Sequence, residues 1–400
     1  MAITAALRTD KLGQTLLRRV EPFVTGRMTV CFSDGQEVVL ANGRPGRVSA
    51  VHIHDMAVFR RIALGGWVGA CDAYIDGMWS TPDLQELLDH MEELDDGFLD
   101  DALRAGPVAR LIETLRFWLQ SNSKRQARRN IAYHYDLGND FYRLWLDETM
   151  TYSSGIFRSG QESLEAAQEA KYASMVDLMG AKPGDHVLEI GCGWGGFAEY
   201  AAAKRGLKVT GLTISKEQLD YAQDRIAKAG LQDRVTLKLQ DYRDEQGRYD
   251  GIASIEMFEA VGQKYWPTYF DKVKTCLKPG AKATLQIITV HDRRWDSYRK
   301  GVDFIQKYIF PGGMLPAPKV LREEVERAGL RVEGSIEFGE SYSQTLRRWH
   351  ETFNEKWEAI AQQGFDNRFR RMWNLYLTSC AAAFHSGNCD VTQITITKPS

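Results

Sequence analysis

The sequence predicts an α/β protein, in which a parallel sheet carries helices on both faces and a smaller α+β domain precedes it. From about residue 185 onward, strand-like and helical segments alternate, which is the pattern of a parallel sheet with crossover helices. Between residues 21 and 60, short apolar segments alternate with turn residues, which indicates a small β-rich unit. Because 400 residues exceed the usual size of one domain, we expect two domains.

The N-terminal domain is expected to combine short strands with helices. The strands are predicted at 28–32, 37–40 and 48–53, and the helices at 56–63, 84–91 and 108–119. A basic segment without acidic residues, 121–130, then gives the clearest change of composition in the chain. We therefore place the N-terminal domain at 1–115, a basic linker at 116–130 and the second domain at 131–400.

The second domain contains the alternating segments. Its strands are predicted at 185–190, 208–213, 235–239, 250–255 and 282–290, and its helices from 194 and at 216–229, 266–277, 317–329, 343–362 and 367–385. The β-branched tail 393–397 is expected to close the sheet as an antiparallel edge. In such sheets ligands bind at the carboxyl ends of the strands.

Composition excludes several classes of function. With 51 basic and 53 acidic residues, the chain has no overall field that attracts nucleic acid. The six cysteines lack Cys-x-x-Cys spacing, which favours reduced thiols and argues against a zinc site. The N-terminus does not resemble a signal peptide, and no apolar run approaches the roughly 20 residues of a membrane span. We expect a cytoplasmic protein without metal, either soluble or peripheral on a membrane.

A glycine-rich turn follows the strand at 185–190, and its glycines are Gly191, Gly193, Gly195 and Gly196. Because glycine has no Cβ, a ligand can approach this backbone closely at a helix N-terminus. The spacing differs from that of dinucleotide sites, and the next strand ends in Thr213 rather than in an acidic residue. Glu189 is placed to position loop amides or to meet a cationic ligand. These features favour S-adenosylmethionine, with a dinucleotide or a turn without ligand as the alternatives.

Further motifs carry a resemblance to a known family. They are Asn-Ile-Ala-Tyr-His-Tyr-Asp-Leu-Gly-Asn-Asp-Phe-Tyr at 130–142, Thr-Tyr-Ser-Ser-Gly at 151–155, Met-Phe-Glu at 257–259, Phe-Pro-Gly-Gly-Met-Leu-Pro at 310–316, and the segments 65–69, 73–79 and 211–218. Over nearly its whole length, the chain resembles the cyclopropane-fatty-acid synthase family. The resemblance implies a Rossmann-like class I methyltransferase fold. It also implies an S-adenosylmethionine-dependent C-methyltransferase that acts on double bonds in phospholipid acyl chains.

The resemblance implies that the cofactor is contacted from several places in the chain. These are Tyr152 and Ser153 at its methionine end, Gly191, Gly193 and Gly195 of the loop, Thr213 and Gln218 on the ribose side, and Tyr242 at the adenine. A tyrosine of the core is the alternative for Tyr242. Arg243 departs from the acidic residue that is usual beside it.

The resemblance further implies a cradle for a bicarbonate ion that takes up the proton. The cradle falls on Ser154, Glu259, Gln286, the backbone of Ile288, and Tyr342. Here serine replaces a cysteine and glutamine replaces a histidine. Both can form hydrogen bonds, but neither titrates near neutral pH. Bicarbonate is therefore expected as a second cofactor only if the serine and the glutamine can still hold it.

Glu256 stands where the family usually has glycine, three residues before Glu259. Like charges held close together raise one pKa of the pair, which is a recognised way to obtain a base. The alternative is an ion pair with a basic side chain. An altered base changes which proton is lost. The expected product is thus either a cyclopropane or a methylated chain without a ring. The methylated chain would belong to a methyl-branched or furan fatty acid pathway.

A phospholipid substrate requires contact with the membrane. The basic segment and the Phe117-Trp118 pair are expected at the inner membrane face, where each cation contributes about 1 kcal/mol; a solvated linker is the alternative. The N-terminal domain is expected to associate with lipid, and the resemblance implies a homodimer. Two rival functions stay open, a lipid- or S-adenosylmethionine-binding protein without catalysis and a dinucleotide oxidoreductase. The sequence lacks the Asn/Asp-Pro-Pro-aromatic motif that is usual in nucleic-acid methyltransferases, which argues against that function.

Overall fold

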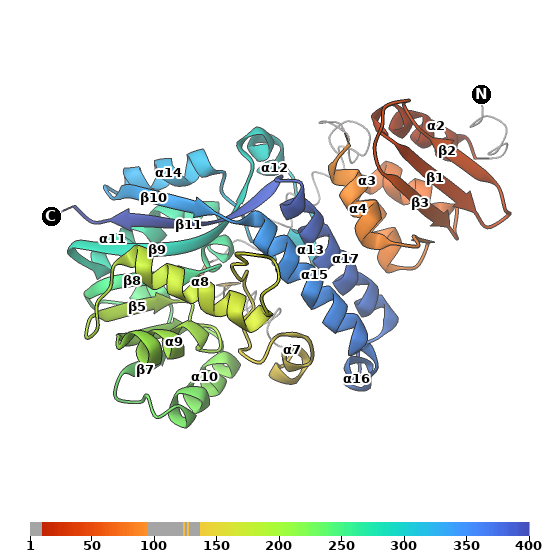
Figure 1. The fold of residues 1–400 in the computed structure, drawn as a ribbon. Helices are drawn as coiled ribbons and strands as arrows, with labels where there is room; N and C mark the ends of the chain where they lie inside the picture. Colours follow the sequence, from red (N-terminus) through yellow and green to blue (C-terminus); the bar gives the residue numbers. More distant parts are fainter. Residues whose placement is uncertain (1–9, 95–122, 125, 128–136, 400) are drawn as a thin grey trace. The chain divides into compact units, whose positions relative to one another are not determined.

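The computed structural model describes residues 10–94, 123–124, 126–127 and 137–399 (Figure 1). The chain forms two compact units: the first comprises 1–119, 296–309 and 360–388, and the second 120–295, 310–359 and 389–400. The predicted helix at 108–119 and most of the predicted basic linker lie outside the described residues. The domain boundaries expected from the sequence therefore stay predictions.

The first unit contains a four-stranded sheet with the order β2-β1-β3-β4. Its strands are β1 (Arg27–Phe32), β2 (Glu37–Leu40), β3 (Val48–Ile53) and β4 (Trp79–Ser80), and its helices are α2 (Lys11–Val20), α3 (Ala57–Ile75), α4 (Leu84–Glu92), α13 (Phe304–Tyr308) and α17 (Asn367–His385). The strands β1, β2 and β3 and the helices α3 and α4 begin close to their predicted positions. This agrees with an α+β unit whose strands bury alternate residues.

The second unit is built on a seven-stranded sheet with the order β10-β11-β9-β8-β5-β6-β7. The strands are β5 (His186–Ile190), β6 (Lys208–Thr213), β7 (Val235–Leu239), β8 (Tyr249–Ile255), β9 (Leu277–Val290), β10 (Arg331–Glu337) and β11 (Cys389–Thr397). Neighbouring strands from β9 to β7 are parallel. The predicted α/β fold with a parallel sheet is confirmed.

Helices cover both faces of this sheet (Figure 1). On one face α8 (Leu164–Met179) packs on α9 (Gly196–Arg205), which packs on α10 (Lys216–Lys228). On the other face α11 (Trp266–Cys276) packs on α14 (Pro318–Arg327). The unit also contains α7 (Asn139–Trp145) and α15 (Gly339–Glu355), while α12 (Trp295–Tyr298) and α16 (Trp357–Gln362) begin in this unit and end in the first. The helix predicted at 343–362 is thus two helices.

The C-terminal strand is antiparallel, as predicted, but it does not form the edge of the sheet, so that part of the prediction is wrong. β11 pairs antiparallel with β9 on one side and with β10 on the other. Val391, Ile394 and Ile396 are almost fully buried, which explains why the tail lies inside the sheet. The edge is β10, whose charged and mostly exposed residues lack the apolar alternation by which strands are predicted.

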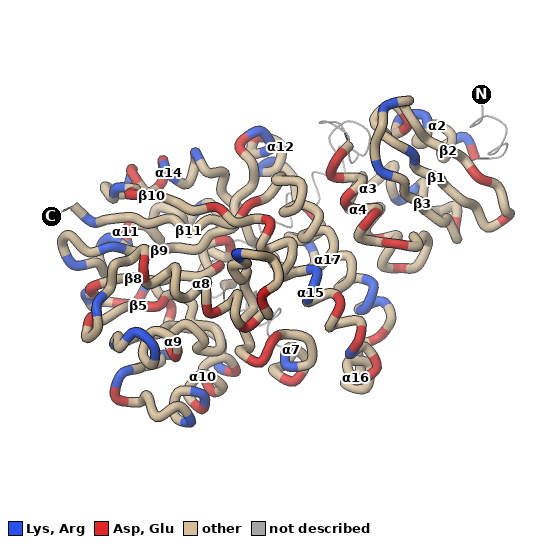
Figure 2. The backbone as a smooth tube through the Cα atoms, viewed as in Figure 1, with Lys and Arg blue, Asp and Glu red and all other residues tan. Residues whose placement is uncertain are grey.

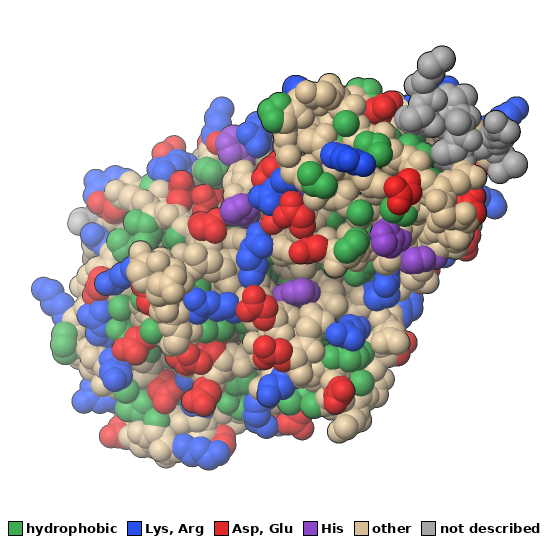
Figure 3. All heavy atoms as spheres, turned by 45° about the vertical axis from the view of Figure 1, so that its right-hand side comes forward, with side chains coloured by type: hydrophobic (Ala, Val, Ile, Leu, Met, Phe, Trp, Pro, Cys, Tyr) green, Lys and Arg blue, Asp and Glu red, His purple; other side chains and the backbone are tan. Residues whose placement is uncertain are grey.

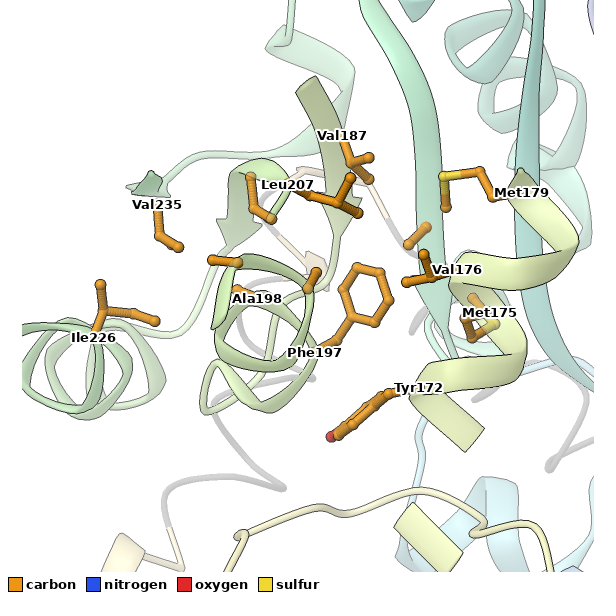
Figure 4. Close-up of a cluster of buried hydrophobic side chains, with 14 residues drawn as sticks. Tyr172, Met175, Val176, Met179, Val187, Phe197, Ala198, Leu207, Ile226 and Val235 are labelled. Atoms are coloured by element: carbon orange, nitrogen blue, oxygen red, sulfur yellow. The ribbon is translucent and has the colours of Figure 1, made fainter. Parts of the chain in front are cut away.

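An apolar cluster joins the sheet to the helices of the first face (Figure 4). Tyr172, Met175 and Val176 of α8 meet Phe197 of α9 there, and Val187 of β5 lies beside them. Phe197 is 1% exposed and contacts the Tyr172 ring edge-on. This packing fixes α9, and with it the glycine-rich turn at its N-terminus.

We expect Phe197→Ala to lower the free energy of unfolding by about 3–5 kcal/mol, because it removes a buried aromatic side chain and leaves a cavity. Denaturant unfolding measures the change. Leu239→Ala, at a position that is 52% exposed, is the control, with a change within about 0.5 kcal/mol. Equal effects of the two substitutions would contradict the assigned core.

Candidate active site

The glycine-rich turn connects the end of β5 to α9. Gly191, Gly193 and Gly195 have φ values of 85°, 50° and 84°, which favour glycine. A Cβ at Gly191 would lie 2.8 Å from Cγ of Met257, whereas one at Gly193 would meet no atom within 4 Å. Glycine is therefore required at position 191 because the Met257 side chain leaves no room for a Cβ. The Gly193 backbone borders open space, as the predicted approach of a ligand requires.

The predicted ribose-side residues lie together after β6. The Thr213 hydroxyl donates to Oε1 of Gln218 over 3.0 Å, and both side chains are buried. Ser215 caps α10 by accepting a hydrogen bond from the Gln218 backbone N–H. This cap and the strand end hold the pair in place, at the carboxyl end of the strand next to β5.

Glu189 and Lys171 are buried charged residues beside the turn. Glu189 is 2% exposed, and among the described residues its Oε2 has no hydrogen-bond partner. Burial raises the pKa of Glu189 to about 8, although Lys171 and Arg225 favour its charged form. An orphaned buried carboxylate oxygen fits the predicted role toward a cationic cofactor.

Lys171 is a site residue that sequence reasoning missed. Its Nζ donates to the Ser153 hydroxyl over 2.6 Å and lies 4.4 Å from the centre of the Tyr172 ring. Burial lowers its pKa to about 7, against the attraction of Glu256, Asp147 and Glu189. The available signal was a lysine within the apolar stripe of α8. The lysine fixes Ser153, which is predicted to hold the methionine end of the cofactor.

Tyr152 belongs to a cluster of aromatic rings. Its ring centre lies 5.4 Å from that of Tyr142, 5.6 Å from Trp145 and 5.3 Å from Trp349. Trp349 also contacts Tyr342 edge-on. Aromatic faces attract cations in dry surroundings. The cluster therefore suits a sulfonium cofactor and a positively charged reaction centre.

Tyr242 lies in a short 3-10 helix, η3 (Tyr242–Asp244). Its ring packs edge-on against Tyr269, and burial raises its pKa. Arg243 forms two hydrogen bonds of 2.8 and 2.6 Å with the buried Asp241. The unexpected arginine is thus explained as a partner of Asp241. The adenine contact of Tyr242 stays a prediction.

The structure brings Ser154, Gln286 and Tyr342 together around one carboxylate, that of Glu256. The Ser154 backbone N–H donates to Oε1 over 2.9 Å, and Nε2 of Gln286 donates to the same oxygen over 2.8 Å. The Tyr342 hydroxyl donates to Oε2 over 2.6 Å. The Ser154 hydroxyl instead donates to the Gly155 carbonyl oxygen. Three predicted members of the bicarbonate cradle therefore bind a side chain of the protein.

Gln286 is held in this orientation by a second amide. Nε2 of Gln393 in β11 donates to Oε1 of Gln286 over 2.9 Å, and Ser174 of α8 donates to Oε1 of Gln393 over 2.6 Å. Gln286 and Gln393 are fully buried and are register partners on β9 and β11. The interior position of β11 thus turns the Gln286 amide hydrogens toward Glu256.

Glu259 makes different contacts from Glu256. Its Oε1 accepts from the Ile288 backbone N–H, and its carbonyl oxygen accepts from the Met314 N–H over 2.9 Å. Among the described residues, its Oε2 has no partner. Burial, and then the charge of Glu256, raise the pKa of Glu259 to about 8. Burial also raises the pKa of Glu256, but its three donors and Lys171 oppose this. The three donors thus favour the charged form of Glu256, whereas burial and the charge of Glu256 favour the protonated form of Glu259.

A free bicarbonate ion does not fit this arrangement. The donors of Ser154, Gln286 and Tyr342 are engaged by Glu256, and the Ile288 N–H is engaged by Glu259. An added anion would face two carboxyl groups, and in the described part of the chain no cationic side chain is hydrogen-bonded to either of them. S-adenosylmethionine, by contrast, fits the open backbone at Gly193 and the orphaned oxygen of Glu189.

Comparison with known proteins identifies the family. A family model described as mycolic acid cyclopropane synthetase matches residues 122–394. The chain belongs to the mycolic acid cyclopropane synthetase family. The resemblance noted from the motifs is therefore confirmed.

The sequences of curated relatives match most of this chain. Tuberculostearic acid methyltransferase UfaA1 of Mycobacterium tuberculosis is 38% identical over 96% of this chain and 90% of its own length. The cyclopropane-fatty-acyl-phospholipid synthase of Escherichia coli is 36% identical over 87% of each chain. The structure of mycolic acid cyclopropane synthase CmaA1 with SAH and CTAB superposes with a TM-score of 0.64 at 30% identity, covering 68% of this chain and 98% of that one. The chain is an S-adenosylmethionine-dependent lipid methyltransferase.

We expect Gly193→Ala to weaken S-adenosylmethionine binding at least about tenfold, because a side chain there would obstruct contact with the backbone. Isothermal titration calorimetry measures the affinity. Gly184→Ala is the matched control, since Gly184 also has a positive φ and open space but precedes β5. Equal loss of affinity in both variants would show that backbone strain, rather than contact with the cofactor, is responsible.

We expect Glu189→Gln to flatten the pH dependence of stability between about pH 5 and pH 7. With its pKa raised to about 8, folded Glu189 keeps a proton that the unfolded chain releases above its ordinary pKa of 4.5. The wild type therefore loses stability as pH rises, by up to about 1.4 kcal/mol per pH unit for this group. Urea unfolding at several pH values measures the slope. The exposed Glu326→Gln is the control, and an unchanged slope in Glu189→Gln would contradict the assignment.

Proposed function

We propose that this enzyme transfers the methyl group of S-adenosylmethionine to a carbon of a double bond in an unsaturated acyl chain of a phospholipid. One observation carries the proposal. The glycine-rich turn after β5 and the Glu256–Glu259 carboxyl pair after β8 follow two strands that are directly paired. A cofactor loop beside a base suits a reaction that adds a methyl group and then removes a proton. The name of the Escherichia coli relative supports a phospholipid acyl chain as substrate, and that of the Mycobacterium tuberculosis relative supports methyl transfer.

The residues of the chain prepare the reaction in three ways. When bound, S-adenosylmethionine supplies an electrophilic methyl group on a sulfonium centre. Lys171 holds Ser153, and the glycine-rich turn offers its backbone, so that the cofactor is oriented. The rings of Tyr152 and Trp349 pack against each other, and in dry surroundings an aromatic face can stabilise positive charge by about 2 kcal/mol or more.

The product depends on which proton leaves. After methyl transfer, the adjacent chain carbon is positively charged. Loss of a proton from the new methyl group closes a cyclopropane ring, whereas loss of a proton from the chain leaves a methylated alkene. The unusual carboxylate of Glu256 favours a methylated chain as the second candidate beside the ring.

Membrane contact and assembly extend the proposal. Among the described residues, no helix is long and apolar enough to cross a bilayer. Lys124 pairs with Asp244, while the other predicted basic residues lie outside the described part. In Figure 2 and on the face drawn in Figure 3, the Lys and Arg residues of the described part are interspersed with Asp and Glu. We infer local contact with the inner membrane face by a cytoplasmic homodimer, with 1–115 as the lipid-associated domain and 131–400 as the catalytic one.

We expect expression in a bacterium without such enzymes, fed methionine with a trideuterated methyl group, to yield deuterated phospholipid acyl chains. Mass spectrometry after separation of phospholipids from free acids measures the label. A ring retains two deuteriums, and loss of a chain proton leaves three. The Gly193→Ala variant is the control with impaired cofactor binding. Absence of label from wild-type phospholipids would contradict the proposal, and would favour a binding protein without catalysis.

A further inference from the structure

The Glu256 carboxylate occupies a site built for an anion. Its two oxygens accept three hydrogen bonds, from the Ser154 N–H, the Gln286 amide and the Tyr342 hydroxyl. These donors come from the loop before α8, from β9 and from α15, so no single element explains their convergence. A carboxylate and a bicarbonate ion share a planar pair of oxygens. The Glu256 carboxylate can therefore accept hydrogen bonds from donors that would otherwise hold a bicarbonate ion.

The backbone at Glu256 is the second, independent observation. Its φ is 49°, in the left-handed region that favours glycine, and Met150 is the only other non-glycine residue with positive φ among the described residues. The Glu256 N–H donates to the Gln286 carbonyl oxygen over 2.9 Å, which fixes this conformation at the end of β8. Strained backbone that persists at a site is typical of a functional constraint. The strain here directs a carboxylate into the donor set.

We propose that Glu256 is the general base of the reaction and takes the place of an exogenous bicarbonate ion. The inference rests on the proposed function, since it concerns the proton that methyl transfer requires to be removed.

The step balances without another reactant. The π electrons of the double bond form the new C–CH₃ bond as the S–CH₃ bond breaks, and the sulfur keeps that electron pair. A Glu256 oxygen then takes a proton. The electron pair of the broken C–H bond forms either the third bond of a cyclopropane or a new double bond. The three hydrogen-bond donors around Glu256 favour its charged form, which a base requires.

Two substitutions at Glu256 test the proposal on the purified enzyme with vesicles of unsaturated phospholipid. Glu256→Gln keeps the shape and fills the same space, and we expect a loss of about 10²–10⁴-fold in kcat. Glu256→Gly opens the site and suits the positive φ, so we expect a similar loss that added formate, acetate or bicarbonate partly reverses. Rescue should increase with the basicity of the anion, as Brønsted behaviour requires. Calorimetric binding of S-adenosylmethionine checks that both variants are folded.

The outcomes separate this inference from the proposed function. Wild-type activity that does not change between carbon-dioxide-depleted and bicarbonate-containing buffer, together with rescue of Glu256→Gly but not of Glu256→Gln, would support Glu256 as the base. Wild-type activity that requires bicarbonate, or full activity of Glu256→Gln, would overturn it while leaving the methyltransferase function intact. A wild-type enzyme that methylates no lipid would instead overturn the proposed function.

Discussion

The three hydrogen bonds to the Glu256 carboxylate are the constraint on which the rest of the site depends. A charge in low-dielectric surroundings is costly unless it is paired and hydrogen-bonded. The donors that satisfy it lie 102, 30 and 86 residues away along the chain. The loop before α8, the strand β9 and the helix α15 must therefore all be in place before this carboxylate is stable.

The interior C-terminal strand connects this constraint to the architecture. β11 places Gln393 beside Gln286, and Ser174 of α8 fixes the Gln393 amide. An amide can present either its oxygen or its hydrogens, and this chain of contacts selects the hydrogens for Glu256. Lys171 on the same helix adds a basic group that favours the charged form of Glu256. One helix thus supports both the cofactor side and the base side of the site.

The sequence predicted those features that depend on local pattern. The strands from β5 to β8 and the glycine-rich turn follow from apolar runs and glycine spacing. β10 was missed because its exposed, charged residues resemble a loop. β11 was misplaced because apolar alternation does not show whether a strand is hydrogen-bonded to a neighbouring strand along both of its edges. Lys171 was overlooked because burial of a lysine is decided by tertiary packing.

The candidate site was predicted as a set of residues, but not in its arrangement. Ser154, Gln286 and Tyr342 were grouped around an ion, and Glu256 was considered as a second carboxylate beside Glu259. Only the structure places the Glu256 carboxylate among those donors. Long-range contacts and the positive φ of Glu256 cannot be inferred from the periodicity of apolar residues in the sequence.

Direct observation of bicarbonate binding tests the central claim most clearly. ¹³C-labelled bicarbonate can be titrated against the wild-type enzyme and against Glu256→Gly, with binding followed by ¹³C NMR line broadening. If Glu256 fills the anion site, the wild type shows no saturable binding, and the glycine variant, whose site is open, does. Saturable binding of bicarbonate to the wild type, displaced by acetate, would contradict the claim.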